Sequence, residues 1–443
     1  MFSFVETSNP FSMHPSNINR RKFITTSLKA SAAGLALAGS FPAKSYARIL
    51  GANDRLNIGV IGCGGMGSGH INALMGMKAS DNIDILAVCD VYDKRRDQAA
   101  QLTGAPGFRH YQRLIDMKEL DYLLIATPEH WHHRIAMDAL DAGKHVYVEK
   151  PMTHTIKEAL QLVEKVEQTG LKLQVGVQGM SDDSYLTANQ YIQQGVLGKI
   201  MMAHIDYSRN GNLWQYEIDP DARPGVNLDW ELWLGPAPKV PWDPKRYFQW
   251  RRYWDYSGGV ATDLFIHRLT RILKAVGLQM PQYVTAAGGY YYFTGPDKAE
   301  VPDTFNMMLD YPGGPTVMLV STQKNNTPIR HLIRGDKATL EFTRTGFEIT
   351  PQKVAGENLI SGTGEKLPVD EEGVLRHVKT GAEDITLHHR NLMAAIREGA
   401  PLNCDAKLGL YGMAACKMGV MSFRKRRYYM WDEQRQKPLK AKA

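Results

Sequence analysis

The feature that most constrains the fold is a glycine-rich turn between an apolar strand pattern and a helical pattern. Residues 56–61 are apolar in the manner of a short buried strand, and Gly62-Cys63-Gly64-Gly65-Met66-Gly67 follows at once. In such a turn the first glycine permits the bend, the second admits a pyrophosphate and the third allows close helix–strand packing. Free N–H groups at the start of the helix, expected over 66–77, would face the phosphates. The motif therefore predicts a dinucleotide site that includes Gly62, Gly64, Gly65, Met66 and Gly67.

An acidic residue after the next predicted strand indicates which dinucleotide is bound. Asp90 follows the strand expected over 84–89. A carboxylate that binds the ribose lies ~20 residues after the glycines, and Asp90 is close to that position. A carboxylate there would repel a 2′-phosphate, so NAD is favoured over NADP, although Arg95 and Arg96 could soften that choice. The alternative interpretation of Asp90 is a cap for the helix expected over 94–102.

Strand and helix patterns continue to alternate up to residue 176. Strands are expected at 122–126, 145–149 and 172–176, with helices at 131–142 and 155–169. Such alternation predicts an α/β fold with a doubly wound parallel sheet. Ligands of such sheets bind beyond the carboxyl ends of the strands. Three turns should meet there, namely 62–67, Thr127-Pro128 and Glu149-Lys150-Pro151.

The first 47 residues resemble an export signal rather than part of the fold. A paired arginine in Asn19-Arg20-Arg21-Lys22-Phe23-Ile24 precedes an apolar run over 27–39 and a small-residue site at 45–47. The apolar run is too short to span a bilayer, and the paired arginine is typical of the twin-arginine route. We therefore expect a periplasmic or exported protein without a membrane anchor. The alternative is a cytosolic enzyme with a basic N-terminus.

Composition excludes several other classes. Hydrophobic residues make up 43% of the chain and charged residues 22%, a globular balance that excludes disordered and collagen-like proteins. The net charge of +7 is mild for 443 residues, so no nucleic-acid partner is expected. Four cysteines without CxxC spacing exclude a disulfide scaffold, and we expect no metal site. Cys63 and Cys89, in apolar strands, are expected to be buried thiols.

Together these motifs resemble the Gfo/Idh/MocA family, the relatives of glucose–fructose oxidoreductase and inositol dehydrogenase. The resemblance rests on the glycine turn, Thr127-Pro128-x-x-x-His132, Glu149-Lys150-Pro151 and Gly258-Gly259-x-x-x-Asp263-x-x-x-His267. It implies an NAD-binding Rossmann domain over 51–176 and a substrate and oligomerisation domain over 177–443. The second domain would be α/β, with an open, mostly antiparallel sheet. The resemblance also suggests a homo-oligomer.

Sequence patterns in the second half agree with such a domain. Strands are expected at 200–207, 284–293, 304–310, 316–321 and 338–343. Pro312-Gly313-Gly314-Pro315 is typical of a hairpin turn. Helical patterns at 387–398 and 407–423 are expected to pack back onto the domains.

Three side chains are the candidates for catalysis. Hydride transfer from an alcohol carbon requires a proton acceptor and a positive charge near the developing oxyanion. The lysine of the Glu-Lys-Pro turn, Lys150, suits the second role, as its counterpart does in the family. His267 suits the first, because an imidazole titrates near neutral pH. Asp263 lies four residues earlier and would share a helix face with His267. Thr270 replaces an aspartate that the family often carries, which leaves the division of proton-transfer roles open.

The resemblance also assigns cofactor contacts to Thr127, Pro128, His132, Glu149, Lys150 and Gln178. The substrate side is less defined, because six of the eight tryptophans lie between residues 214 and 254. These tryptophans could stack on a sugar, pack against one another or form a subunit interface. Trp254 and Tyr256 are expected to contact sugar, being nearest to Asp263. Arg209, Arg251 and Arg252 could meet a hydroxyl-rich or acidic ligand.

Two enzyme classes and one binding class remain open. The first is an NAD-dependent oxidoreductase that acts on a hydroxyl of a sugar, glycoside or polyol. The second is a glycosidase that uses NAD in place, through oxidation, elimination and re-reduction without net redox change. Outside the cytoplasm, a tightly bound cofactor would suit either of these two enzymes. A sugar-binding relative without catalysis is disfavoured because Lys150, Asp263 and His267 are all present.

Overall fold

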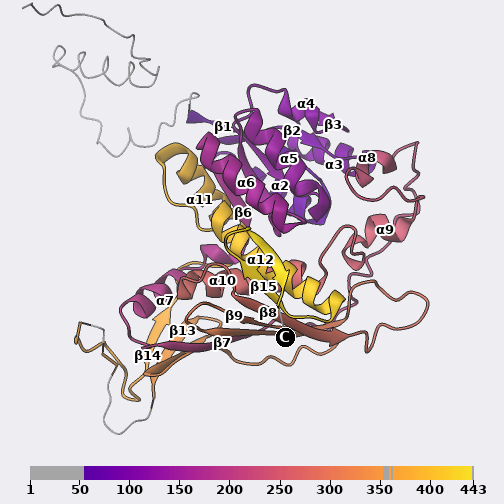
Figure 1. Cartoon of the computed structure of the whole chain (residues 1–443). Helices are drawn as coiled ribbons and strands as arrows, with labels where there is room; N and C mark the ends of the chain where they lie inside the picture. The colour runs from indigo at the N-terminus through magenta and orange to yellow at the C-terminus, as the bar shows by residue number, and fades with distance from the viewer. Residues whose placement is uncertain (1–53, 353–358, 361–362, 442–443) are drawn as a thin grey trace, which may run out of the picture. The chain divides into compact units, whose positions relative to one another are not determined.

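The computed structural model describes residues 54–352, 359–360 and 363–441 (Figure 1). The signal expected over 1–47 lies outside the described residues. Among the described helices, none combines the length and the apolar character that crossing a membrane requires.

The first sheet has six parallel strands in the order β3-β2-β1-β4-β5-β6, which confirms the predicted doubly wound sheet. Its strands are β1 (Leu56–Ile61), β2 (Ile83–Cys89), β3 (Gly107–Phe108), β4 (Tyr122–Ile125), β5 (His145–Glu149) and β6 (Leu173–Gly176). The helices between them are α2 (Gly65–Met77), α3 (Asp93–Thr103), α4 (Gln112–Ile115), α5 (Glu129–Asp141) and α6 (Ile156–Thr169). Every residue of β4 is buried, as expected of a strand covered on both faces. The strand order reverses between β1 and β4, where ligands of such sheets bind.

The second sheet has ten strands in the order β14-β13-β12-β11-β7-β10-β9-β8-β15-β16. All neighbours in it are antiparallel except β7 and β10, which confirms the expected mostly antiparallel sheet. Its strands are β7 (Ile200–Asp206), β8 (Tyr283–Gly289), β9 (Thr304–Asp310), β10 (Thr316–Thr322), β11 (His331–Gly335), β12 (Ala338–Phe342), β13 (Gly346–Pro351), β14 (Leu375–Val378), β15 (Tyr429–Asp432) and β16 (Lys437–Lys440).

The strand expected over 284–293 ends earlier, at Gly289, for a local reason. The backbone N–H groups of residues 291, 292 and 293 all donate to one carboxylate oxygen of Asp303, at 2.9, 2.8 and 3.0 Å. These donors are therefore unavailable to a neighbouring strand, and the chain turns.

Long helices join the two sheets. α12 (Ala406–Lys425) contacts α6 on one side and β8 on the other, and Figure 1 shows it in yellow between the first domain and the second sheet. Two of its glycines let it approach its neighbours closely. A Cβ on Gly409 would lie 2.7 Å from Val175, and one on Gly412 would lie 2.9 Å from Ile266. α11 (Ile385–Glu398) adds Leu392 and Met393 to the core of the first domain.

Shorter helical elements follow β6 along the chain. They are η3 (Gln178–Ser181), α7 (Ser184–Gln193), α8 (Trp230–Leu234), α9 (Pro244–Phe248), η4 (Trp250–Arg252), the π-helical turn η5 (Ala261–Phe265) and α10 (Ile266–Val276). Among them, α7 and α10 contact each other and the second sheet. All four cysteines are free and buried, which confirms the expectation for Cys63 and Cys89.

The glycine turn makes a prediction about stability. A Cβ on Gly67 would lie 1.8 Å from the carbonyl oxygen of Gly62, whereas a Cβ on Gly65 would meet no atom within 4 Å. We expect Gly67→Ala to lower the free energy of unfolding by about 1–3 kcal/mol, because the added methyl group would push the glycine turn and α2 apart. Gly65→Ala is the matched control and should leave stability unchanged or slightly higher. Denaturant unfolding of both variants checks this, and equal stability would contradict the packing described.

Candidate active site

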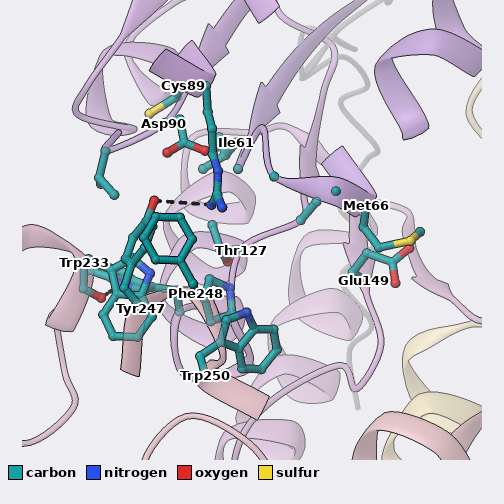
Figure 2. Close-up of a pocket in the computed structure, with 18 of the residues that line it drawn as sticks. Ile61, Met66, Cys89, Asp90, Thr127, Glu149, Trp233, Tyr247, Phe248 and Trp250 are labelled. Carbon is teal, nitrogen blue, oxygen red and sulfur yellow. Dashed lines mark hydrogen bonds between the residues drawn. The ribbon is translucent and has the colours of Figure 1, made fainter. Parts of the chain in front are cut away.

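The carboxyl edge of the parallel sheet borders a cavity of about 480 Å³ (Figure 2). The three turns that the sequence predicted to meet do line this one cavity. From the first domain the lining includes Gly62, Gly64, Gly65, Met66, Asp90, Arg95, Thr127, Pro128, Trp131, Glu149 and Lys150. From the second half of the chain it includes Tyr216, Trp233, Tyr247, Phe248, Trp250 and Arg251.

The glycine turn and its surroundings fit the phosphates and ribose of a dinucleotide. Gly62 has a φ of +90°, and a Cβ there would lie 2.7 Å from the backbone of Ala126. Space is open over Gly65, at the start of α2, where the first N–H groups lack intrahelical partners. Thr127 also lines the cavity, and within the described part of the chain its buried hydroxyl oxygen has no hydrogen-bond partner. Such groups are satisfied when a polar ligand occupies the cavity.

Asp90 holds the turn in place. Its carboxylate accepts hydrogen bonds from the backbone N–H groups of Cys63 at 2.8 Å and Tyr92 at 2.9 Å. It does not cap α3, whose N-cap residue is Tyr92. Burial raises the pKa of Asp90, although Arg95 and the two backbone N–H groups work against that rise. A carboxylate has about four acceptor sites, so two remain for ribose hydroxyls.

Residues 213–256, here called the aromatic segment, form the opposite wall. Its backbone is hydrogen-bonded to the loop after β2, from Asp93 N to Asn227 O at 2.8 Å and from Asp229 N to Val91 O at 3.0 Å. Arg95 donates to the Tyr247 hydroxyl at 3.3 Å, which is the dashed line in Figure 2. The second half of the chain thus closes one side of the proposed cofactor cavity.

The guanidinium of Arg95 is also surrounded by aromatic rings. It lies 5.9, 5.2 and 5.5 Å from the ring centroids of Tyr92, Tyr247 and Phe248 respectively. Cation–π contacts of this kind hold the side chain against the aromatic segment. Arg95 is therefore engaged at the wall of the cavity.

Lys150 lies at the centre of a buried charge cluster. Its ammonium donates to the Asp263 side chain at 2.7 Å and to the Asp263 carbonyl at 2.9 Å. Arg251 donates to the same carboxylate oxygen at 2.9 Å. Burial opposes the charge of Asp263, but the two cations outweigh burial and lower its pKa far below the ordinary value. Asp263 is therefore ionised, and it holds Lys150 at the cavity wall.

Another buried carboxylate fixes the segment that carries Asp263. Glu129, at the start of α5, accepts hydrogen bonds from the hydroxyls of Ser257 at 2.8 Å and Thr262 at 2.9 Å. It also accepts from the backbone N–H of Gly258 at 3.3 Å. The first domain therefore positions the glycine-rich approach to Asp263, a role that the sequence did not reveal.

His267 lies outside the lining of the cavity, although the charges of Lys150 and Asp263 both act on it. Its imidazole stacks on Tyr207 with centroids 6.1 Å apart, and its Nδ1 lies 3.9 Å from Glu383. Asp263 lies in the π-helical turn and His267 lies in the first turn of α10, and the helix face expected to be shared by the pair stays a prediction.

The environment of His267 keeps the imidazole neutral. Burial and then the charges of Lys150 and Arg271 lower its pKa well below the ordinary value. The side chain retains 13% exposure. A neutral, partly accessible imidazole can accept a proton.

Glu149 and Gln178, both predicted cofactor contacts, are joined to each other. The Gln178 amide donates to Glu149 at 2.6 Å, and the same oxygen lies 2.8 Å from Nε2 of His70. Nδ1 of His70 lies 2.9 Å from Nε2 of His389. Glu149 lines the cavity, whereas Gln178 lies beneath it. His70, three residues after the glycine motif, was missed because this network is visible only in three dimensions.

His132 acts behind the cavity rather than in its lining. Its two ring nitrogens lie 2.7 Å from the Pro151 carbonyl and 2.8 Å from the Thr127 carbonyl. It therefore links two of the turns that form the site. Next to it, Trp131 lines the cavity, while His130 is buried against the Trp233 carbonyl at 3.0 Å.

The aromatic residues require a correction. Tyr256 is 0% exposed and packs edge-on against Trp233, so it cannot contact a sugar in this structure. Trp254 packs beneath Arg424, 5.1 Å from its guanidinium, and lies outside the cavity lining. Proximity in sequence to Asp263 was a poor guide, because the chain turns between them. Several tryptophans pack against one another, as the alternative interpretation held, and Trp230 stacks on Trp233 at 4.9 Å.

Comparisons with solved structures agree with this fold. A levoglucosan dehydrogenase in complex with NADH is 20% identical with a TM-score of 0.63, over 84% of this chain and 98% of that one. At this identity the likeness concerns the fold alone.

Curated relatives match over shorter stretches. A "Glycosyl hydrolase family 109 protein" of Shewanella pealeana is 28% identical over 46% of this chain and 48% of that protein. "Inositol 2-dehydrogenase 2" of Saccharopolyspora erythraea is 36% identical over 34% of this chain and 44% of that protein. The chain thus spans about half the length of these two relatives.

Family models match most of the described chain. Residues 56–177 match "Oxidoreductase family, NAD-binding Rossmann fold". Residues 188–285 and 238–431 match two models described as "Oxidoreductase family, C-terminal alpha/beta domain". The chain therefore belongs to the Gfo/Idh/MocA family of NAD-dependent oxidoreductases.

Proposed function

We propose that this protein transfers a hydride between NAD and a hydroxyl-bearing carbon of a sugar, glycoside or polyol. The observation that supports this most is the position of Lys150. Its ammonium lies at the wall of the cavity that the glycine turn also lines, and Asp263 holds it there at 2.7 Å. When bound, NAD would supply the hydride acceptor.

The residues around the cavity have distinct proposed roles. Lys150 holds the substrate hydroxyl and stabilises the negative charge that develops on its oxygen. Asp263 and Arg251 keep the ammonium in position. His267, neutral near pH 7, accepts the hydroxyl proton from the substrate.

We also propose that the cofactor is NAD and that it is held tightly. Asp90 borders the cavity and carries a negative charge that disfavours a 2′-phosphate when ionised. Of the two cations that could favour NADP, Arg95 donates to Tyr247 at 3.3 Å and Arg96 donates to Asp93 at 2.5 Å. The aromatic segment, hydrogen-bonded to the loop after β2, would have to move before a dinucleotide could leave past it.

An NAD-cycling glycosidase is the second candidate function. The wall formed by the aromatic segment supports this candidate, because the wall would retain the cofactor. A retained cofactor suits a reaction without net redox change. When bound, NAD would accept the hydride and later return it. Oxidation of a ring hydroxyl to a ketone would acidify the neighbouring C–H, His267 would accept that proton, and the glycosidic oxygen would leave with its electron pair and gain a proton. Water would then add to the resulting double bond before the ketone is reduced.

One experiment separates the two functions. Purified protein is incubated with glycosides and with free sugars, without added NAD. Release of sugar from glycosides supports the cycling enzyme. Conversion of free sugar only when an electron acceptor is supplied supports the oxidoreductase. Neither product, together with no cofactor in denatured protein, would favour a binding protein.

The role of Lys150 is tested by Lys150→Met. We expect turnover to fall about 10²–10³-fold, because the charge that stabilises the oxyanion is removed. Folding should persist, since Arg251 still pairs with Asp263 at 2.9 Å. Lys157→Met, at an exposed position of α6, is the control and should retain full turnover. Near-normal turnover in Lys150→Met would remove this residue from the mechanism.

The retention of the cofactor is tested by Tyr247→Ala. We expect this variant to lose NAD during dialysis, because the partner of Arg95 at the cavity wall is removed. Tyr253→Ala is the matched control, since Tyr253 packs in the same aromatic cluster without lining the cavity. Bound NAD is measured by absorbance after denaturation and filtration. Equal retention by both variants would show that the aromatic segment does not hold the cofactor.

We further propose export by the twin-arginine route. Replacing Arg20 and Arg21 by lysine should leave the unprocessed precursor in the cytoplasm, because that route depends on the paired arginine. Cell fractionation followed by N-terminal sequencing of the product measures this. Processed product outside the cytoplasm in the double variant would contradict the proposal.

A further inference from the structure

A second cavity of about 230 Å³ lies where β7 ends and β11 begins. Tyr207, Arg209, Arg268 and His331 line it, together with Asp206 and Ser208. This cavity has no lining residue in common with the cavity at the glycine turn.

The two guanidiniums in this cavity lack a counterion. Within the part of the chain that the structure describes, no carboxylate lies within 4.0 Å of Arg209 or Arg268. Nε of Arg268 is buried and has no hydrogen-bond partner among the described residues. Each guanidinium instead lies 5.0 Å from the centroid of the Tyr207 ring, and Arg209 also donates to the Tyr207 hydroxyl at 3.1 Å.

The acidic residue of the cavity, Asp206, forms no ion pair with either guanidinium among the described residues. Oδ1 of Asp206 accepts hydrogen bonds from the backbone N–H of Ser208 at 3.1 Å and from its hydroxyl at 2.5 Å. Asp206 is therefore engaged by its own turn. Arg268 is partly buried and Arg209 is exposed, so the cavity presents one sheltered and one accessible guanidinium to an anion.

We infer that this cavity binds the carboxylate of an acidic sugar, which would make the substrate a uronic acid or its glycoside. The planar guanidinium fork matches a carboxylate in two parallel hydrogen bonds. This inference rests on the proposed function, because it names the substrate class of the same enzyme. A phosphate ester on the sugar would present similar chemistry, and the experiment below distinguishes it.

Tyr207 connects this cavity to the proposed proton acceptor. Its ring stacks on His267 with an interplanar angle of 8°, and Arg268 follows His267 directly on α10. A sugar whose carboxylate binds Arg209 and Arg268 would therefore be anchored beside His267.

The other two arginines that could meet an acidic ligand, Arg251 and Arg252, have partners within the protein. Arg251 pairs with Asp263, and Arg252 contacts Gln249 at 2.5 Å and the Asp297 carbonyl. Of the three arginines that the sequence singled out, Arg209 is the one that lines this second cavity.

Calorimetric binding to the holoenzyme tests the inference. Methyl glucuronide and methyl galacturonide are each compared with their neutral glycosides, and glucose 6-phosphate is compared with glucose. We expect at least one uronide to bind about tenfold more tightly than its neutral partner, as charged hydrogen bonds of this kind provide. A preference for the phosphate ester alone, or no preference for any acidic sugar, would overturn the uronate assignment.

Variants separate this inference from the proposed function. Arg268→Gln should remove most of the preference for the uronide and leave the affinity for the neutral glycoside within about twofold. Arg334→Gln, at an exposed position of β11 outside the cavity, is the control and should keep the preference. Equal weakening of both ligands by Arg268→Gln would contradict the inference. Because binding is measured without turnover, a protein that binds uronides but transfers no hydride would refute the proposed function alone.

Discussion

The contact between Lys150 and Asp263 is the constraint on which the site depends. It joins the end of β5, in the first domain, to the π-helical turn of the second domain, at a distance of 2.7 Å. Both side chains are nearly buried, at 9% and 8% exposure, so removing Asp263 would leave the Lys150 ammonium without its carboxylate partner. The pair therefore fixes the two domains in the arrangement that places an ammonium at the cofactor cavity.

Other buried carboxylates support this arrangement. Glu129 fixes the turn before Asp263 through Ser257 and Thr262, and Glu149 is bound by His70 and Gln178 behind the glycine turn. Each is held by hydrogen bonds from elements far away in sequence, and such contacts lower the pKa of both residues despite burial. The polar groups around the cavity are thus oriented before any ligand binds, which is the condition for electrostatic stabilisation of a transition state.

The first domain was largely predictable because its signals are local. The run at 56–61 and the strand at 145–149 have the predicted bounds, since apolar strands next to glycine or proline turns are recognisable from periodicity. β11 and β13 to β16 were missed; all five are short, and the last four lie at the two ends of the second sheet. Lys150 and Asp263 could be named from their motifs. The partnership of Arg251 with Asp263, the role of Glu129 and the burial of Tyr256 depend on long-range packing that no local pattern encodes.

The most direct measurement of the central claim follows the hydrogen itself. Protein carrying bound NAD is incubated with sugars and glycosides, neutral and acidic, that are deuterated at every ring carbon, and the cofactor is then extracted. The account predicts deuterium at C4 of the nicotinamide for at least one ligand that binds, and loss of that label in Lys150→Met. Binding of these ligands to the NAD-loaded protein without deuterium in the cofactor would contradict hydride transfer at this site.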